Sequence, residues 1–239
     1  MDMDLPHTER PETHVERPGR RVQLIETAVF LFLITPSMAA SFLTDRHANL
    51  RFMEMAISSI LNDLALLSLV LYFMWRNEEP MRRVGWNFDR LGRDIAWALI
   101  LFVPVVFVGN LIQSVLHQVG FSVPARQPPF LTVSGLINVI LGLTIVTVVA
   151  VVEETIFRGY LMLRLEAITG RISAAVLLSS LVFSLGHGYE GMAGAISVFV
   201  LGMVFALIYL WRSSLVAPVV IHFLVDFTSL VLPALLQEL

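Results

Sequence analysis

The sequence predicts an all-α fold: a polytopic membrane helical bundle with about seven transmembrane helices. Of its 239 residues, 56% are hydrophobic and only 15% are charged, which is typical of a membrane protein. The apolar residues also gather into seven stretches. Most of these stretches have a length near 20 residues, which is about what a helix needs to cross the hydrocarbon core. Because lipid offers no hydrogen-bond partners to the backbone, we expect each stretch to be helical.

The seven predicted helices follow one another with short connections. They cover residues 22–43, 53–75, 95–117, 131–152, 172–188, 192–211 and 214–236. They belong to one transmembrane domain, 22–239, which follows a polar stretch with three prolines, 1–21, predicted to be a disordered cytoplasmic tail. The longest connection, 76–94, is basic and is predicted to lie on the cytoplasmic surface.

The arginines indicate how the bundle is oriented. All 16 basic residues are arginine, and most of them lie in the tail and in the connections after the second, fourth and sixth helices. Cytoplasmic loops carry an excess of Arg and Lys, so this bias predicts a cytoplasmic N-terminus. We expect an integral, multi-pass protein of the plasma (cytoplasmic) membrane, with the lipid bilayer as its surroundings.

The composition also excludes several classes of function. The chain has no cysteine, which rules out disulfides, thiol nucleophiles, iron–sulfur clusters and thiolate zinc sites. Its formal net charge of −3 gives no indication of nucleic-acid binding, and no nucleic-acid partner is expected. The His-Glu-x-x-His motif of zinc proteases and the Gly-x-Ser-x-Gly motif of serine hydrolases are both missing from the sequence.

The most informative feature is a pair of adjacent acids, Glu153 and Glu154, at the end of the fourth apolar stretch. A charged residue such as aspartate at the centre of a membrane helix costs about 2.5–3.5 kcal/mol on insertion scales. Two neighbouring carboxylates therefore need a partner, a proton or a function. Glu154 and Arg158 share a helix face at i,i+4 and can form an ion pair. Glu153 points about 100° away around the helix and is free to meet other groups.

Two later stretches contribute histidines. Glu153 and His187 lie equally far from Gly170, the predicted turn between the fourth and fifth helices, so an antiparallel hairpin brings both to one height. That height lies far enough from the turn that we expect the hairpin to project, to tilt or to break near the glutamates. His222 and Asp226 are spaced i,i+4 and can point into the same cavity.

One carboxylate and two imidazoles in a bundle fit two hydrolytic chemistries. In the first, Glu153 is a general base that takes a proton from water, one histidine shares that proton, and the other helps to stabilise the oxyanion. In the second, Glu153, His187 and His222 bind a divalent metal such as zinc, which keeps one position open for water. The residues themselves leave both chemistries open.

In order and spacing, these groups resemble the motifs of the CPBP family of intramembrane proteases. That family contains the type II CAAX prenyl endopeptidases and the bacterial Abi proteins of bacteriocin self-immunity. The three motifs read Glu153-Glu154-x-x-x-Arg158, Phe183-x-x-x-His187 and His222-x-x-x-Asp226. The resemblance covers about 131–236, the predicted catalytic core, and implies a membrane-embedded endopeptidase with a cavity open to the cytosol.

The resemblance also implies roles for the first two motifs. Glu153 and His187 would activate the hydrolytic water. Glu154 and Arg158 would orient that first pair.

The third motif departs from the family pattern. His222 and Asp226 would form the oxyanion side of the site, but this motif often ends in asparagine in the family. An ionised aspartate only accepts hydrogen bonds. Asp226 is therefore protonated, or orients His222, or binds a metal.

We therefore expect an intramembrane endopeptidase that hydrolyses a peptide bond in a lipidated, prenyl CAAX-like, or otherwise membrane-bound peptide. Two other classes fit the same residues. A proton-coupled carrier also holds acids and histidines inside the membrane, although the sequence shows no inverted repeat. A non-catalytic membrane scaffold or bacteriocin-immunity factor would share the fold. Asp63, an acid in the second helix, is interpreted as a structural partner.

Overall fold

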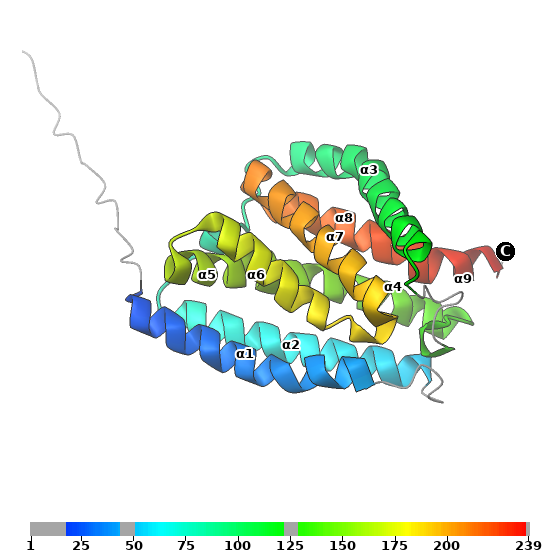
Figure 1. Cartoon of the computed structure of the whole chain (residues 1–239), viewed down its shortest axis with the longest axis horizontal. Coiled ribbons are helices and arrows are strands. Elements are labelled where there is room, and N and C mark those ends of the chain that lie inside the picture. The colour runs from blue at the N-terminus through cyan, green and yellow to red at the C-terminus, as the bar shows by residue number, and fades with distance from the viewer. Residues whose placement is uncertain (1–17, 44–50, 122–128, 238–239) are drawn as a thin grey trace, which may run out of the picture.

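The computed structural model describes residues 18–43, 51–121 and 129–237, and these residues form a helical bundle without strands (Figure 1). Most of the predicted tail, 1–21, lies outside the described residues, and α1 already begins at Arg20. The longer helices are α1 (Arg20–Leu43), α2 (Phe52–Arg76), α3 (Leu91–Gln118), α4 (Leu136–Glu153), α5 (Met162–Thr169), α6 (Ile172–Leu185), α7 (Gly191–Arg212), α8 (Val216–Asp226) and α9 (Leu232–Gln237). Three short 3-10 turns, η1 (Met81–Val84), η2 (Pro129–Leu131) and η4 (Gly188–Glu190), and two π-helical segments, η3 (Glu154–Leu161) and η5 (Phe227–Val231), join them.

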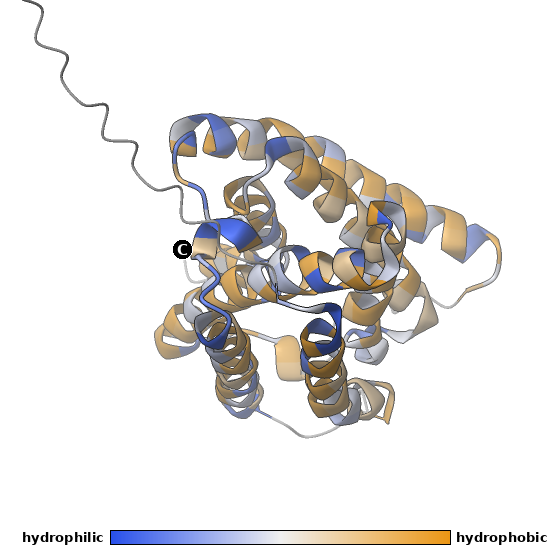
Figure 2. Cartoon of the chain, turned by 90° about the vertical axis from the view of Figure 1, so that its left-hand side faces the viewer, coloured by the Kyte–Doolittle hydropathy of each residue, from blue (hydrophilic) through white to orange (hydrophobic). Residues whose placement is uncertain are grey.

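Within the described residues, six helical stretches are long and apolar enough to cross a membrane, and α6 is a seventh, shorter apolar helix of 14 residues. Figure 2 shows hydrophobic residues along the lengths of the helices and hydrophilic ones mainly at their ends. The chain is therefore an integral, multi-pass membrane protein, and the predicted all-α bundle of about seven helices is confirmed.

Several predicted helix boundaries differ from the structure, and three of the errors have clear local reasons. The fourth helix begins at Leu136 instead of 131, because the chain first forms η2 and then passes through Gly135 with a positive φ of 79°. The fifth helix ends at Leu185 instead of 188, which leaves His187 in a turn. The last begins at Val216 instead of 214, after Ser213 in the left-handed region with φ 52°.

Two motif acids, Glu153 and Asp226, each end an α-helix, and a π-helical segment begins directly after each of them. From Leu136 to Thr169 the chain is one helical stretch of 34 residues, which at α-helical rise would span about 51 Å against a hydrocarbon core of about 30 Å. Its π-helical part, η3, begins directly after Glu153. The second π segment, η5, begins directly after Asp226. The irregularity expected near the glutamates is thus a π turn inside a continuous helix.

The connection between α2 and α3 packs into the bundle, so its predicted surface position was wrong for its central part. Val84 is completely buried, and the indole Nε1 of Trp86 donates a hydrogen bond to Thr155 Oγ1 at 3.1 Å. The backbone N–H of Leu215 donates to the carbonyl of Gly85 at 2.9 Å. The apolar Val84 and Trp86 explain this course, because they bury their surface against η3 instead of exposing it to water.

A buried polar network ties α1 and the connection after α2 to α5. The guanidinium of Arg164 is completely buried and forms ion pairs with Glu79 and Glu26. Glu26 also accepts a hydrogen bond from the hydroxyl of Tyr160 at 3.1 Å and pairs with Arg76 at 2.6 Å. Breaking such a network by removing one partner leaves a buried charge unpaired, so these residues hold this end of the bundle together.

We expect Gly159→Ala to destabilise the protein by about 1–3 kcal/mol, the usual cost of an overpacked core. A Cβ at this position in η3 would lie 2.6 Å from the backbone carbonyl oxygen of Val84, and backbone cannot move away as a flexible side chain can. Thermal unfolding in detergent measures the effect. Gly92→Ala is the matched control, because a Cβ there meets nothing within 4 Å. Equal melting temperatures for the two variants would contradict the close packing of η1 on η3.

Candidate active site

Glu153 and Glu154 stand at the junction of α4 and η3, and both approach the imidazole of His222 on α8. Glu154 Oε1 lies 2.9 Å from His222 Nδ1, and Glu153 Oε2 lies 3.7 Å from His222 Nε2. Adjacent residues on a helix point in different directions, so two neighbouring carboxylates can reach opposite edges of one ring. π-helical segments of this kind recur at functional sites.

The ion pair predicted between Glu154 and Arg158 is present. Arg158 Nη1 lies 2.8 Å from Glu154 Oε1, and the two side chains are only 1% and 0% exposed. The guanidinium also lies over the ring of Phe183 at 4.2 Å and near that of Phe205 at 5.3 Å, in cation–π geometry. Glu154 therefore joins Arg158 to His222 inside the protein.

The contacts of His222 determine which of its nitrogens faces the site. A carboxylate only accepts hydrogen bonds, so Nδ1 carries a proton and donates it to Glu154. Nε2 then faces two other carboxylates, Glu153 at 3.7 Å and Asp226 at 3.5 Å. Three acids from α4, η3 and α8 thus surround one imidazole.

His187 follows the end of α6 and reaches this cluster through an aromatic ring. Its Nδ1 lies 3.2 Å from the carbonyl oxygen of Phe183, which can only accept, so Nδ1 donates, and in the neutral ring Nε2 carries the lone pair. The Phe183 ring centroid lies 4.9 Å from that of His187 and 6.2 Å from that of His222. The two imidazoles thus pack against the same phenylalanine.

The structure brings the predicted residues together, and it places Glu154 against His222. Contacts join Glu153, Glu154, Arg158, His222 and Asp226 directly. The resemblance implied that Glu154 and Arg158 orient the water-activating pair, whereas Glu154 contacts the histidine of the oxyanion side.

Burial separates the cluster into an inner and an outer part. Glu154 is completely buried, whereas the side chains of Glu153 and Asp226 are 19% and 31% exposed. Glu153 Oε2 itself is buried and, among the described residues, has no hydrogen-bond partner. Buried polar atoms are almost always bonded, so this oxygen is a specific candidate acceptor for a proton from water.

The residues described do not fit a metal site. Within those parts of the chain, no group of three or more Asp, Glu or His side chains is arranged to hold a metal ion. His187 directs Nδ1 at a backbone carbonyl. Among the described residues, Glu153, His187 and His222 are therefore not arranged as the ligands of one metal ion.

Asp63 on α2, interpreted from the sequence as a structural partner, lies on the face of α2 that packs into the bundle. Helix periodicity explains the position: Ile60 and Leu67 pack against the core three residues before and four after it, so Asp63 lies on the same inward stripe. The helical spacing of Ile60, Asp63 and Leu67 in the sequence could have predicted that Asp63 faces the bundle.

The register of α2 against α4 places Asp63 at the level of the glutamates. Near one end, the ring of Phe52 lies 3.8 Å from where a Cβ on Gly142 would be. Near the other, the rings of Phe73 and Tyr160 stack with centroids 6.3 Å apart. Along α2, Asp63 is about midway between Phe52 and Phe73. Along the partner helix, the two glutamates are about midway between Gly142 and Tyr160.

Sequence reasoning also missed Tyr189, which follows the second motif in η4. Its ring centroid lies 6.0 Å from that of His187 and 6.3 Å from that of Phe130 in η2. It lies in a short turn, where neither the helical nor the strand period predicts the direction of a side chain, so no spacing signal identified it.

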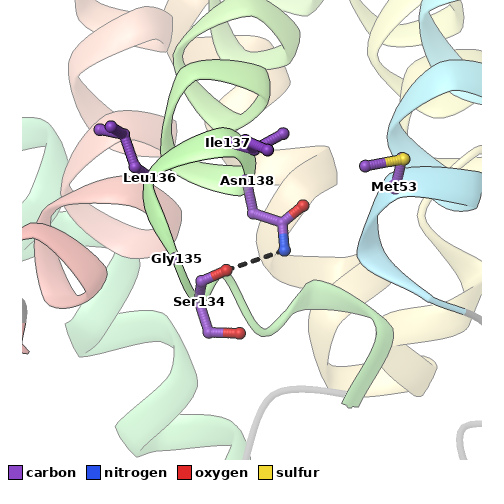
Figure 3. Close-up of a pocket in the computed structure, with 6 residues that line it drawn as sticks. All are labelled: Met53, Ser134, Gly135, Leu136, Ile137 and Asn138. Atoms are coloured by element: carbon purple, nitrogen blue, oxygen red, sulfur yellow. Dashed lines mark hydrogen bonds between the residues drawn. The ribbon is translucent and has the colours of Figure 1, made fainter.

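A surface hollow beside the start of α4 is separate from this cluster (Figure 3). It is lined by Met53 and by residues 134–138, and the amide of Asn138 donates a hydrogen bond to the backbone carbonyl of Ser134 at 2.8 Å. None of the motif residues lines it. This hydrogen bond accounts for a polar side chain near the start of an apolar helix.

Comparison with known proteins gives one finding on identity. Residues 135–228 match the family model described as type II CAAX prenyl endopeptidase Rce1-like, and this segment contains all three motifs. The search of curated proteins and the search of solved structures gave no match. The family match supports the resemblance drawn from the motifs: residues 135–228 are similar to the Rce1-like type II CAAX prenyl endopeptidases.

Proposed function

We propose that this chain is an intramembrane endopeptidase that hydrolyses a peptide bond in a lipidated, CAAX-like, or otherwise membrane-bound peptide. The observation that carries the proposal is the buried Oε2 of Glu153, which accepts no hydrogen bond from the described residues and lies 3.7 Å from His222 Nε2 within an apolar bundle. The family match supports a protease in general. The site's position among membrane-spanning helices supports a lipidated substrate, because a peptide anchored in the bilayer would be concentrated beside it.

In the proposed mechanism, Glu153 is the general base. It takes one proton from water while the water oxygen forms a bond to the scissile carbonyl carbon, and the π electrons of the carbonyl move to its oxygen. The lone pair at His187 Nε2 shares the task of holding that proton. Glu153 contributes to the reaction only while it is ionised, so neighbouring groups that set its charge matter for the rate.

His222 acts on the opposite side of the reacting carbonyl. Its Nδ1–H is held by Glu154, which Arg158 fixes in turn. In its imidazolium form, His222 donates the Nε2–H to the oxyanion. When the tetrahedral intermediate collapses, the C–N bond breaks, its electron pair goes to nitrogen, and the proton held by Glu153 is transferred to the leaving amine.

The site would be reached from the cytoplasmic side of the plasma membrane. The arginine bias supports a cytoplasmic N-terminus, and with that orientation the end of α5 and the network around Arg164 would lie at the cytoplasmic face. In a bacterial cell, a signalling or bacteriocin-related peptide would fit the same entry route as a prenylated one.

The test uses purified protein in lipid nanodiscs with three peptides: a farnesylated C-terminal peptide, the same peptide without its lipid, and a transmembrane peptide. We expect the lipidated peptide to be cleaved at least about tenfold faster than its unlipidated form, because a single lipid chain gives reversible membrane binding. In H₂¹⁸O, mass spectrometry should find one heavy oxygen in the new carboxylate.

Each peptide decides a different part of the proposal. Cleavage of the transmembrane peptide alone would contradict the lipidated substrate but support the hydrolase. Failure of the protein to cleave any of the three would favour the carrier or the scaffold. A carrier would still bind its solute after Glu153→Gln, and a scaffold would retain its cellular phenotype after Glu153→Ala and His187→Ala.

A further inference from the structure

Parts of the chain before α4 support the motif residues through hydrogen bonds. On α1, Ser41 Oγ accepts a bond from the backbone N–H of Gly188 at 3.2 Å and donates to the carbonyl of Leu185 at 2.9 Å, on either side of His187. A second support comes from residues 84–87 (the bracing segment), in the connection between α2 and α3. It contacts the elements of the first and the third motif together.

The reaction depends on how these two elements lie against each other. Glu153 lies where α4 passes into η3, whereas His222 lies on α8. In the proposed mechanism both act on one reacting carbonyl, and Glu153 Oε2 lies 3.7 Å from His222 Nε2. A displacement of about 1 Å, caused far from the chemistry, can cost about 10²-fold in rate. Residues that fix η3 against α8 therefore bear on catalysis.

The bracing segment bonds to η3 directly beside the acids. The indole Nε1 of Trp86 donates to Oγ1 of Thr155 at 3.1 Å, and Thr155 follows Glu154 in the chain. The same hydroxyl donates to the carbonyl of Val151 at 2.6 Å, one turn back in α4. A hydroxyl has one proton to donate and lone pairs to accept with, so Thr155 makes both bonds at once. It thereby ties the bracing segment to the junction of α4 and η3.

The bracing segment also holds the start of α8. The backbone N–H of Leu215, the residue before this helix, donates to the carbonyl of Gly85 at 2.9 Å. The hydroxyl of Ser214 donates to the carbonyl of Asn87 at 3.3 Å. His222 follows Leu215 by seven residues, about two helical turns, so it lies on the same side of the helix as this anchor.

Close packing holds the three pieces in register. A Cβ on Gly159 of η3 would lie 2.6 Å from the carbonyl oxygen of Val84 and 3.4 Å from the side chain of Leu215. A Cβ on Gly85 would lie 3.2 Å from the same leucine and 2.4 Å from the ring of Tyr209 on α7. Backbone and side chains thus leave the bracing segment no space to slide between η3 and α8.

We propose that the bracing segment is a positioning element of the active site. The hydrogen bond from Trp86 to Thr155 holds η3 in register with α8. That register sets the distance from Glu153 to His222 during the reaction. This inference rests on the proposed peptidase function and deepens it by adding Trp86 and Thr155 as positioning residues. They act through Glu154, the neighbour of Thr155, which accepts the Nδ1–H of His222.

Thr155→Val tests the proposal, because valine keeps the shape of threonine and lacks the hydroxyl. Cleavage is measured on the best substrate found in nanodiscs. We expect kcat to fall about 10- to 100-fold while KM changes less than about threefold, since substrate binding does not use this bond. Thr155→Ser keeps the hydroxyl and should recover most of the lost rate. Thr144→Val is the matched control and should keep full activity, because Thr144 also bonds to the carbonyl four residues back but is exposed.

A double-mutant cycle tests whether the two residues act through one bond. Trp86→Phe keeps an aromatic ring without the indole N–H, and its kcat should fall about as far as that of Thr155→Val. The double variant should lose no more than either single variant, because one bond can be broken only once. Trp97→Phe is the matched control and should keep full activity, since Trp97 packs on Trp211 at 5.0 Å. Losses that multiply in the double variant, or a near-wild-type kcat for Thr155→Val, would overturn the proposal.

A measurement without substrate separates this inference from the proposed function. The proton that His222 Nδ1 donates to Glu154 gives a signal in NMR of the ¹⁵N-histidine protein in nanodiscs, identified by its loss in His222→Ala. Thr155→Val should shift this signal, and Thr144→Val should not. If the wild type cleaves no peptide, the peptidase falls, whereas a shifted signal still supports the bracing segment and an unshifted one refutes it. If the wild type and Thr155→Val cleave equally fast, the peptidase stands and the positioning role is refuted.

Discussion

Glu153→Gln should abolish peptide hydrolysis, with a fall in kcat of about 10³-fold or more. General bases contribute about 10²–10⁴-fold, and a neutral amide cannot take the proton of water. A loss of 10³ corresponds to about 4 kcal/mol of transition-state stabilisation. Glutamine keeps the shape of the side chain, so the bundle should remain folded. Discontinuous cleavage assays with purified protein in nanodiscs measure the rate, and size-exclusion chromatography checks the fold.

Glu166→Gln is the matched control, because Glu166 is exposed on α5 of the same long helix. It should retain wild-type cleavage. His187→Ala should lower kcat to a similar extent as Glu153→Gln, and the double variant should be little worse than either, since groups that act as one unit are not additive. Near-wild-type hydrolysis by purified Glu153→Gln would refute the assignment of the base.

Arg158→Ala should destabilise the folded protein by about 3–5 kcal/mol, the cost of breaking a buried ion pair on one side. Alanine would leave Glu154 completely buried without its cation, 2.8 Å from where the guanidinium had been. It would also remove the cation that lies 4.2 Å from the ring of Phe183. Thermal unfolding in a mild detergent should show a clearly lower midpoint, with activity reduced even below that midpoint because Arg158 no longer fixes the carboxylate that contacts His222.

Arg82→Ala is the control for the charge change itself. Arg82 pairs with Asp89 at 3.1 Å, but its side chain is 69% exposed, and exposed pairs contribute only about 0–1 kcal/mol. Replacing both members of the inner pair, as Glu154→Gln with Arg158→Met, should recover part of the stability, since no lone charge stays buried. An unchanged unfolding midpoint for Arg158→Ala would show that the pair contributes nothing to the fold.

The sequence predicted the bundle well because lipid imposes one rule on every spanning segment. Stretches of apolar residues must be helical there, so each long stretch identified a helix. The pair of Glu154 with Arg158 was equally predictable, since i,i+4 spacing determines which side chains meet on one helix. Contacts within a single element follow from its period alone.

Contacts between elements were less predictable. Which imidazole Glu154 would reach depends on how α8 packs beside η3, and helical periodicity carries no information on that. The packing of Val84 and Trp86 against the bundle was not predicted, because the arginines around them in the sequence suggested a surface loop. Tyr189 was missed because its direction is determined by a turn pressed against α1.

The hydrogen bond from Gly188 to Ser41 has a consequence for truncated forms of this protein. The segment shared with the family starts at residue 135, yet a hydroxyl from the first helix fixes the loop after its second motif. Trp86, also outside that segment, bonds to Thr155 next to the acids. The segment that matches the family is therefore tied to the early helices at two points, and we expect a shortened version without them to lose the packing around its motif residues even with every one of those residues retained.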